Sequence, residues 1–223
     1  MSPHFTTDGY EIVPSRLSSE TLHNLRLEAD HLATAEKSAC VRHIRAKSNL
    51  FAQLAISPEL LNHLPPNFTP VRSILFDKNS AQNWPVAWHQ DLTITTTTQK
   101  EVSGYGPWSQ KDGSPHVQPP TELLSQMITI RLHLDDTPSE NGALSVIPKS
   151  HLLGKIPSSE LSTEQLKNPV TCACAEGDIL LMSPLILHRS SRAQKPARRR
   201  VLHFEYAPQK ALHPDLQWFE ATT

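Results

Sequence analysis

The N-terminal part of the chain repeats its apolar residues with a helical period. One apolar stripe is formed by Leu22, Leu25 and Leu32. With Ser18 or Ser19 as a capping residue, this stripe predicts a helix over residues 17–34. A serine followed by proline at residues 57–58 predicts the start of a second, short helix, because proline suits the first helical position. Residues 1–66 are therefore expected to be mainly helical.

The remainder of the chain has the pattern of short strands. The segments rich in Thr, Val, Ile and aromatic residues, bounded by Pro, Asn, Asp or Gly, are residues 71–76, 86–97, 127–134, 170–175, 179–182 and 201–206. Helices followed by many short strands indicate an antiparallel sandwich or barrel with helices packed outside it. We therefore expect one domain over residues 1–223, mainly β with flanking α-helices, in which residues 67–208 form the core and residues 1–66 pack on it.

Residues 100–120 interrupt this pattern, because they show no hydrophobic period. A long loop in a compact domain is usually functional or disordered. Tyr105, Trp108 and His116 are large side chains for a flexible linker, and they favour an ordered lid over a pocket. The alternative is a loop with a purely structural role.

Composition excludes several classes of protein. Lys and Arg number 21 against 22 Asp and Glu, so the net charge of −1 provides no global attraction for nucleic acid or an anionic membrane. No apolar run is long enough to span a bilayer, and the N-terminus does not resemble a signal peptide. The three cysteines do not make a paired framework and suit a reducing compartment. We expect a cytoplasmic protein that binds neither nucleic acid nor membrane.

The strongest local chemical signal is His89-Gln90-Asp91, within a predicted strand. Residues two apart on a strand share one face, so His89 and Asp91 converge while Gln90 points away. An imidazole and a carboxylate make two-thirds of the facial triad that holds non-haem Fe(II). His188, at the end of an apolar strand, is a candidate third ligand. Taken alone, His89 and Asp91 are more typical of a solvated polar pair than of a metal site, and the position of His188 does not distinguish a ligand from an ordinary strand-end histidine.

Further motifs extend this signal along the chain. In order, they are Trp88-His89-Gln90-Asp91, Leu134-Asp135-Asp136, Asn141-Gly142-Ala143-Leu144, Ile147-Pro148-Lys149-Ser150-His151, Gly177-Asp178, His188 and Arg199. Together they resemble the phytanoyl-CoA dioxygenase family, from about Arg72 to Tyr206. The resemblance implies a double-stranded β-helix, which is a cupin-like jelly roll, and an Fe(II)- and 2-oxoglutarate-dependent oxygenase. Lys149 stands where the family usually has glycine, which puts the local turn geometry in doubt but not the metal site.

Carried onto this sequence, the resemblance makes His89, Asp91 and His188 the iron ligands. It makes Arg199 the partner of the distal carboxylate of 2-oxoglutarate, because a guanidinium forks onto a carboxylate as lysine cannot. Ser190 matches a family hydroxyl that bonds the same carboxylate. The implied reaction hydroxylates a small molecule with O2 and releases succinate and CO2. Asp91 favours hydroxylation over halogenation, since related halogenases carry Gly or Ala at that position.

Weaker candidates surround this set. Arg72 lies either near 2-oxoglutarate or on the surface, and Arg131 shares with His133 a polar face that is either cavity or solvent. The other substrate-pocket candidates are Gln90, Lys78, Trp84, Trp108 and His116, of which Lys78 and Trp84 also suit a hairpin turn.

Two rival functions stay open at this stage. The first is a cupin-like metal enzyme without 2-oxoglutarate, such as a hydrolase or isomerase, which has no use for Arg199 and Ser190. The second is a non-catalytic binding module that uses the basic residues between 192 and 200. Neither the substrate nor the oligomeric state follows from the sequence.

Overall fold

The computed structural model describes residues 1–195 and 197–220. Its helices are α1 (Pro3–Asp8), α2 (Ser19–Glu36), α3 (Ile44–Lys47), α4 (Asn49–Ala55), α5 (Pro58–Leu61) and α6 (Thr121–Gln126), with short 3-10 turns at Ser139–Asn141, Ser150–Leu153 and Ser158–Glu160. The helix predicted over residues 17–34 corresponds to α2, which is capped by the Ser18 side chain. The short helix predicted to start at residues 57–58 corresponds to α5, which has Pro58 in its first turn. Among the described residues, no helix combines the length and apolar character needed to cross a membrane.

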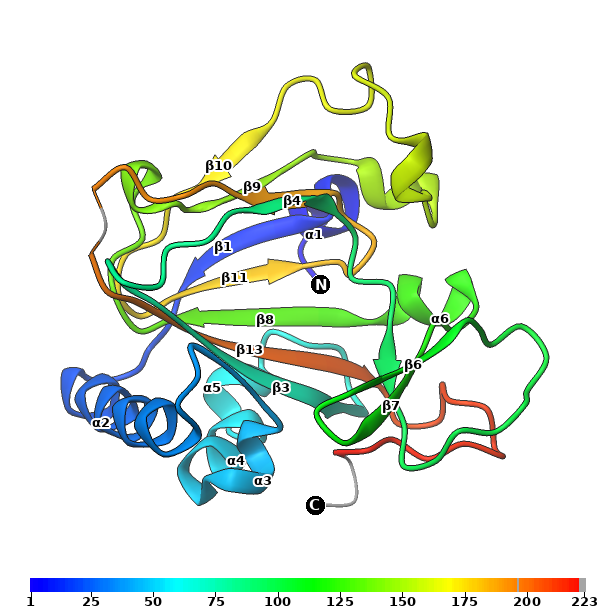
Figure 1. The fold of residues 1–223 in the computed structure, drawn as a ribbon, viewed down its shortest axis with the longest axis horizontal. Helices are drawn as coiled ribbons and strands as arrows, with labels where there is room; N and C mark the ends of the chain where they lie inside the picture. Colours follow the sequence, from blue (N-terminus) through cyan, green and yellow to red (C-terminus); the bar gives the residue numbers. More distant parts are fainter. Residues whose placement is uncertain (196, 221–223) are drawn as a thin grey trace.

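The strands form three antiparallel sheets (Figure 1). The large sheet has the order β1 (Tyr10–Pro14), β11 (Asp178–Met182), β8 (Ile128–His133), β13 (Arg199–Pro208), β3 (Phe68–Lys78) and β2 (Cys40–Arg42). The small sheet has the order β10 (Val170–Cys172), β9 (Leu144–Val146), β12 (His188–Ser190) and β4 (Val86–His89). The third sheet has the order β5 (Ile94–Thr95), β7 (Ser114–Val117) and β6 (Trp108–Lys111). The fold is a double-stranded β-helix, as predicted.

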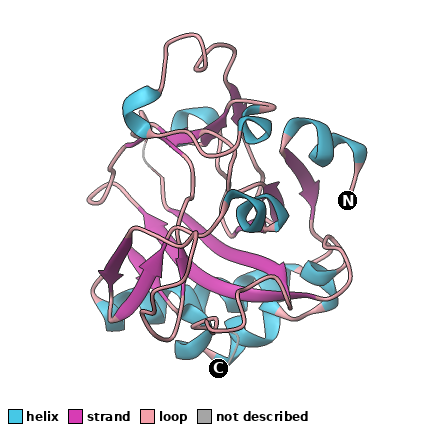
Figure 2. Cartoon of the chain, turned by 90° about the vertical axis from the view of Figure 1, so that its right-hand side faces the viewer, coloured by secondary structure: helices cyan, strands magenta, loops and turns pink. Residues whose placement is uncertain are grey.

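The large sheet separates the main hydrophobic core from the interior of the β-helix. Figure 2 shows helices packed under the large sheet, on the side away from the small sheet. Alternation along β13 explains this division. Leu202, Phe204 and Tyr206 point into the core with the apolar residues of α2, α4 and α5, whereas Val201, His203 and Glu205 line a cavity on the other face.

The structure adds strands to two segments whose sequence showed no strand pattern. Residues 1–66 hold α1–α5 and also contribute strands to the large sheet, because β1 pairs with β11 and β2 pairs with β3. Residues 100–120 contain β6 and β7, which are joined as a hairpin. The strand expected over residues 86–97 is interrupted between β4 and β5.

The last strand in the sequence occupies the middle of the large sheet. β13 pairs with β3 over ten positions and with β8 on its other side. The chain then turns back, so that Trp218 bridges to Thr96 and the buried carboxylate of Glu220 accepts hydrogen bonds from Ser73. The end of the described chain is therefore fixed against the same sheet that forms the cavity floor.

Candidate active site

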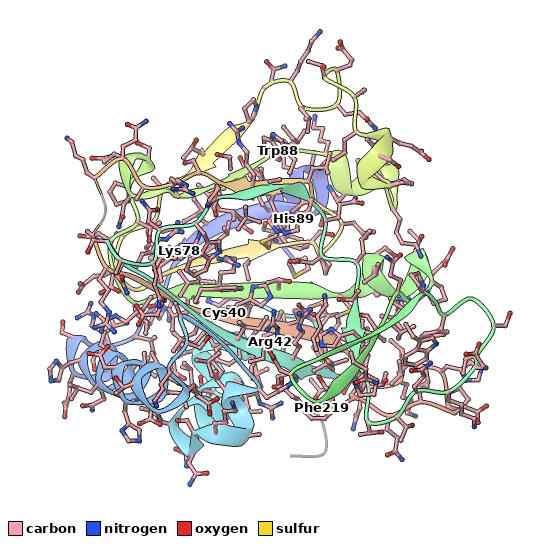
Figure 3. All side chains as sticks on the ribbon, in the orientation of Figure 1. Cys40, Arg42, Lys78, Trp88, His89 and Phe219 are labelled. Atoms are coloured by element: carbon pink, nitrogen blue, oxygen red, sulfur yellow. The ribbon has the colours of Figure 1, made fainter. Side chains whose placement is uncertain are left out.

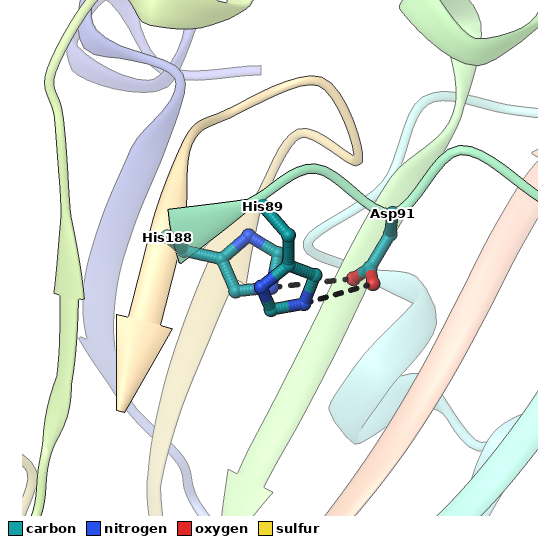
Figure 4. A group of neighbouring side chains, drawn as sticks. All are labelled: His89, Asp91 and His188. Carbon is teal, nitrogen blue, oxygen red and sulfur yellow. Dashed lines mark ion pairs between the residues drawn. The ribbon is translucent and has the colours of Figure 1, made fainter. Parts of the chain in front are cut away.

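Three side chains converge at the edge of the small sheet. β12 and β4 pair so that His188 lies directly opposite His89. Asp91 lies two residues past the end of β4, where its backbone N–H donates to the carbonyl of Pro184 at 2.9 Å. The chain leaves the strand before Asp91, and this backbone bond positions the turn that directs its carboxylate toward the two imidazoles (Figure 4).

The ring tautomers leave the two histidines ready to bind a metal. The Nδ1–H of His89 donates to the carbonyl of Ala87 at 2.8 Å, and that of His188 donates to Ile186 at 3.0 Å. Each Nε2 therefore carries a lone pair. These Nε2 atoms lie 3.7 and 3.6 Å from the carboxylate oxygens of Asp91, and one ligand atom from each residue lies within 4.8 Å of the others. Two imidazoles and one carboxylate on a common centre fit an Fe(II) ion with open positions.

The charge states of His188 and Asp91 also suit a metal. Burial lowers the pKa of His188 to about 4, so the ring is neutral at physiological pH. Burial acts to raise the pKa of Asp91, but three nearby imidazoles and Arg72 outweigh it and hold that pKa below its ordinary value. His188 therefore offers a neutral nitrogen ligand and Asp91 an ionised carboxylate, and neither has to release a proton to bind a metal.

A cavity of about 210 Å³ extends from these residues between the large and small sheets. Its polar and charged lining residues are Arg42, Arg72, Lys78, Trp84, His89, Asp91, Arg131, His133, His188, Ser190, Arg199, His203 and Glu205. Apolar side chains, including Ile74, Phe76, Val86 and Leu144, complete the walls. Basic residues thus outnumber acidic ones in this cavity, although the whole chain is almost neutral.

Arg199 faces the cavity, and its neighbours in the sequence do not. The Arg199 guanidinium donates to the backbone carbonyl of Gly142 and makes no ion pair with any described carboxylate. Burial lowers its pKa to about 10, so it stays charged. Arg198 bonds both oxygens of Asp77, at 3.1 and 2.8 Å, and Arg200 bonds Asp135 on the outer face. This arrangement agrees with the alternation expected along the strand.

Ser190 and Lys78 meet at the same end of the cavity. Ser190 lies two residues beyond His188 on β12 and accepts a hydrogen bond from Nζ of Lys78 at 3.1 Å. The same Nζ donates to the carbonyl of Trp84 at 2.7 Å and lies 4.4 Å from the centre of the Trp84 ring. Lys78 lies opposite Arg199 in the β3–β13 register. Ser190, Lys78 and Arg199 therefore line the same cavity, with Lys78 in contact with the serine and opposite the arginine.

A chain of hydrogen bonds runs along the large-sheet side of the cavity. Arg131 donates a hydrogen bond from its Nη1 to Nδ1 of His203 at 2.9 Å. Because that nitrogen accepts, the Nε2–H of His203 is free to donate to Glu205, at 3.2 Å. Glu205 also accepts from Arg72 at 3.0 Å. Arg72 and Arg131 thus belong to the cavity rather than to the surface or solvent face that was considered as an alternative.

Three of the predicted substrate-pocket residues do not line this cavity. The Gln90 amide donates to the carbonyls of Gly154 and Leu185, at 2.8 and 2.6 Å, and accepts from the N–H of Ile156 at 2.7 Å. These hydrogen bonds connect the turn after β4 to the backbone at residues 154–156 and at Leu185. Gln90 therefore lies outside the cavity lining, with its amide hydrogen-bonded to backbone groups, and the structure gives no support to the prediction that it contacts substrate.

Trp108 and His116 are also directed elsewhere. Trp108 packs against a cluster that includes Ile94, Leu185 and Trp218. His116 is fully buried beside Ser114, 3.4 Å from its hydroxyl, and burial lowers its pKa to about 3. Both side chains hold the third sheet in place. The hairpin reaches the cavity at its turn, where Asp112 forms an ion pair with the cavity residue Arg42.

Arg42, His203 and Glu205 are cavity residues that the sequence reasoning did not identify. For His203 and Glu205 a signal existed, because they share the alternating face of β13 with Arg199. Arg42 lies on a strand of three residues, which is too short to show a period. Lys149, which stands where the family usually has glycine, adopts a backbone conformation typical of glycine. It has a φ of 68°, in the left-handed region that favours glycine.

The fold and the site together define a class of protein, a double-stranded β-helix with a His-Asp-His metal cluster at the edge of its small sheet. The family model for phytanoyl-CoA dioxygenase (PhyH) matches residues 5–201. The chain belongs to this family, as the sequence motifs indicated. No curated protein matches the chain.

Solved structures share the fold at low sequence identity. HygX from Streptomyces hygroscopicus, with nickel and 2-oxoglutarate bound, is 17% identical with a TM-score of 0.66, over 92% of this chain and 84% of its own. The epimerase SnoN, in complex with Fe3+, α-ketoglutarate and nogalamycin RO, is 17% identical with a TM-score of 0.71, over 92% and 80%. The carbocyclase SnoK from nogalamycin biosynthesis is 16% identical with a TM-score of 0.67, over 93% and 84%.

Proposed function

We propose that this protein is an Fe(II)- and 2-oxoglutarate-dependent dioxygenase that hydroxylates a small molecule and releases succinate and CO2. The observation that carries the proposal is the presence of two complementary sites in one cavity. A facial set of metal ligands lies on one side, and a buried arginine without a carboxylate partner among the described residues lies on the other. Relatives with iron or nickel and 2-oxoglutarate bound support this interpretation.

Each residue has a distinct task in this proposal. His89, Asp91 and His188 would hold Fe(II), and their tautomers are fixed by backbone carbonyls. Arg199 and Ser190 would hold the distal carboxylate of 2-oxoglutarate through charge-assisted hydrogen bonds. When bound, the iron supplies the redox chemistry that activates O2. The large-sheet residues shape the remaining space and limit the access of water to it.

The same cavity argues against an enzyme that uses only a metal. A cupin-like hydrolase or isomerase without 2-oxoglutarate has no need for Arg199, whose burial costs desolvation and is not offset by any acid among the described residues. A nucleic-acid-binding module is equally poorly supported, since Arg198 and Arg200 of the basic cluster are engaged by Asp77, Asp30 and Asp135.

Hydroxylation is the proposed outcome, although relatives with this fold include an epimerase and a carbocyclase. Asp91 completes the ligand set and leaves no position for a halide. The proposed location is the cytoplasm, where the three free thiols Cys40, Cys172 and Cys174 would stay reduced. We further propose that residues 100–120 form a lid, with the Arg42–Asp112 ion pair as the link between this segment and the cavity.

The test is succinate formation from 2-oxoglutarate by the Fe(II)-loaded protein under O2, with and without pools of candidate small molecules. We expect succinate above background that rises with a substrate, and a product that gains one oxygen atom by mass spectrometry. An unchanged product mass would instead indicate epimerisation, and a loss of two hydrogens would indicate ring closure or desaturation. Absence of both 2-oxoglutarate binding and succinate would contradict the proposal.

A further inference from the structure

The end of the cavity beyond the metal ligands holds more positive charge than one carboxylate needs. Lys78 and Arg199 are opposite one another on β3 and β13, so their side chains start about 5 Å apart on the same face. Among the described residues, neither forms an ion pair with a carboxylate. Outside the cavity, by contrast, Arg198 and Arg200 have acidic partners. The two inner cations therefore lack an anion.

Lys78 is held in place rather than free to move into solvent. Its Nζ donates to the carbonyl of Trp84 and to the hydroxyl of Ser190, and the residue is only 8% exposed. A protonated lysine has three N–H donors, and these two bonds use two of them. One donor remains for a ligand, next to the hydroxyl that the proposed function assigns to the distal carboxylate (Figure 3 labels Lys78 and His89 between the sheets).

The surroundings of Lys78 oppose its charge when no anion is present. Arg199 on β13 and Arg131 on β8 face it within the cavity, together with His133, which is neutral because burial lowers its pKa to about 3. Burial, followed by the charges of Arg199 and Arg131, lowers the pKa of Lys78 to about 7. Without ligand, the amine is thus divided between its neutral and protonated forms near physiological pH.

We propose that Lys78 is a second cationic ligand of the distal carboxylate of 2-oxoglutarate, and that the cosubstrate binds together with one proton. This inference rests on the proposed function. The proton comes from the solvent and converts the Lys78 amine to an ammonium, and no other bond is made or broken. Because an adjacent carboxylate favours the charged form of an amine, the pKa of Lys78 is higher in the complex than in the free protein.

The direction of the pH dependence follows from this difference. Below pH 7, Lys78 is already protonated and the cosubstrate gains the full benefit of its charge. Above pH 7, a proton must be taken up on binding, so affinity for 2-oxoglutarate falls by about tenfold per pH unit until the pKa of the complex is reached. Both carboxylates of 2-oxoglutarate are ionised throughout this range and add no slope.

Titration calorimetry of the Fe(II)-loaded protein with 2-oxoglutarate, without O2, tests the proposal. Measurements in two buffers of different ionisation enthalpy give the number of protons taken up. With a pKa of about 7, we expect about 0.9 proton at pH 8 and about 0.1 at pH 6. In Lys78→Met the uptake at pH 8 disappears, and affinity at pH 6 falls by about 10- to 100-fold.

Two further variants separate the role of Lys78 from a general effect on folding. Lys78→Arg keeps a charge that does not titrate, so it should bind 2-oxoglutarate at least about tenfold more tightly than Lys78→Met and without proton uptake. Lys155→Met removes a lysine that also donates to a carbonyl, that of Pro119, but lies outside the cavity. It should match the wild type in both quantities.

The possible failures are distinguishable. If the wild type binds 2-oxoglutarate and Lys78→Met takes up the same number of protons, Lys78 is not the group that titrates and the inference is wrong, while the proposed function stands. The same conclusion follows if the wild type binds without proton uptake at pH 8. If the Fe(II)-loaded wild type does not bind 2-oxoglutarate at all, the proposed function is wrong and this inference is wrong with it.

Discussion

The two faces of β13 use arginine in opposite ways. On the outer face, Arg200 bonds Asp135 at 2.6 Å and Asp30 at 2.7 Å, and these hydrogen bonds raise its pKa. On the inner face, Arg199 contacts a backbone carbonyl, and burial lowers its pKa to about 10. The outer charge is neutralised within the fold, whereas the inner one has no acidic partner among the described residues and is the group that we propose binds 2-oxoglutarate.

The outer arginine is therefore expected to contribute to the stability of the fold, and the inner arginine of the same strand to ligand binding. A buried charge costs desolvation, which a carboxylate of the same chain offsets on the outer face. On the inner face the Gly142 carbonyl offsets only part of this cost and no described carboxylate pairs with Arg199, so a bound dianion, as proposed above, would lower the cost further. Substitutions on the two faces are therefore expected to affect different measurements.

The largest effect is expected at the only acidic metal ligand. Asp91→Ala removes the anionic member of the ligand set, and we expect turnover to fall by more than about 100-fold, since even groups that only support a metal ligand cost about 10- to 100-fold. The melting temperature of the metal-free protein should change little. Turnover and thermal unfolding check this, and near-normal turnover would contradict the assignment of the ligand set.

Arg199→Lys is the direct test of the inner face. One ammonium cannot reproduce the two parallel hydrogen bonds of a guanidinium, so affinity for 2-oxoglutarate should fall by about 10- to 150-fold, which corresponds to about 1.5–3 kcal/mol. The matched control is Arg198→Lys, which should bind 2-oxoglutarate normally. A loss of affinity in the control, with none in Arg199→Lys, would reverse the assignment of the two faces.

Arg200→Met tests the outer face. It removes the arginine that Asp135 and Asp30 share, while Arg26 still pairs with Asp135 and Arg198 with Asp30. We expect the free energy of unfolding to fall by about 1 kcal/mol. Affinity for 2-oxoglutarate, corrected for the unfolded fraction, should not change. Urea unfolding and calorimetry measure the two quantities, and a specific loss of binding would show that the outer arginine also serves the cavity.

His116 adds a buried polar group that belongs to neither face. Burial lowers its pKa in the folded protein to about 3, so between pH 6.5 and pH 3 the unfolded chain binds a proton there and the folded chain does not. Stability therefore falls as the pH decreases. From pH 6.5 to pH 5.5 the contribution is roughly 1 kcal/mol, and His116→Gln should remove it. Identical pH profiles in urea unfolding would contradict this role.

The smallest effect is expected at Lys149, which lies apart from both faces. Its left-handed backbone favours glycine, so Lys149→Gly should raise the free energy of unfolding by about 0.5 kcal/mol without changing cosubstrate affinity. Lys155→Gly, at a residue without positive φ, is the control and should not be stabilised. Destabilisation of Lys149→Gly would show that the lysine side chain makes a contribution larger than the backbone strain.

The residues that were predictable share a local cause. Strand alternation places Arg199 on the face opposite to Arg198 and Arg200, and it places His203 on the same face as Arg199. Both placements depend only on the period of two along β13. The placement of Gln90 depends on bonds to Gly154 and Leu185, more than sixty residues away, and no local pattern contains that information.

The hairpin of residues 108–117 is not predictable from the sequence, for a different reason. Three of the four residues of β6 are exposed and β7 includes a proline, so neither strand shows alternation or a high strand propensity. Its position comes instead from Trp108 in the cluster with Trp218 and from the Arg42–Asp112 ion pair. Contacts with the far end of the chain determine this element, and sequence periodicity does not report them.

The central position of β13 has a consequence for how the protein is made. β3 and β8 emerge from the ribosome long before β13, and each must pair with it. Until then both present unpaired backbone groups to the cell, which is the condition under which nascent β-proteins aggregate or require chaperones. The strand that ends this exposure also carries Arg199. The nascent chain would therefore acquire the proposed anion-binding site in the same step that completes its large sheet.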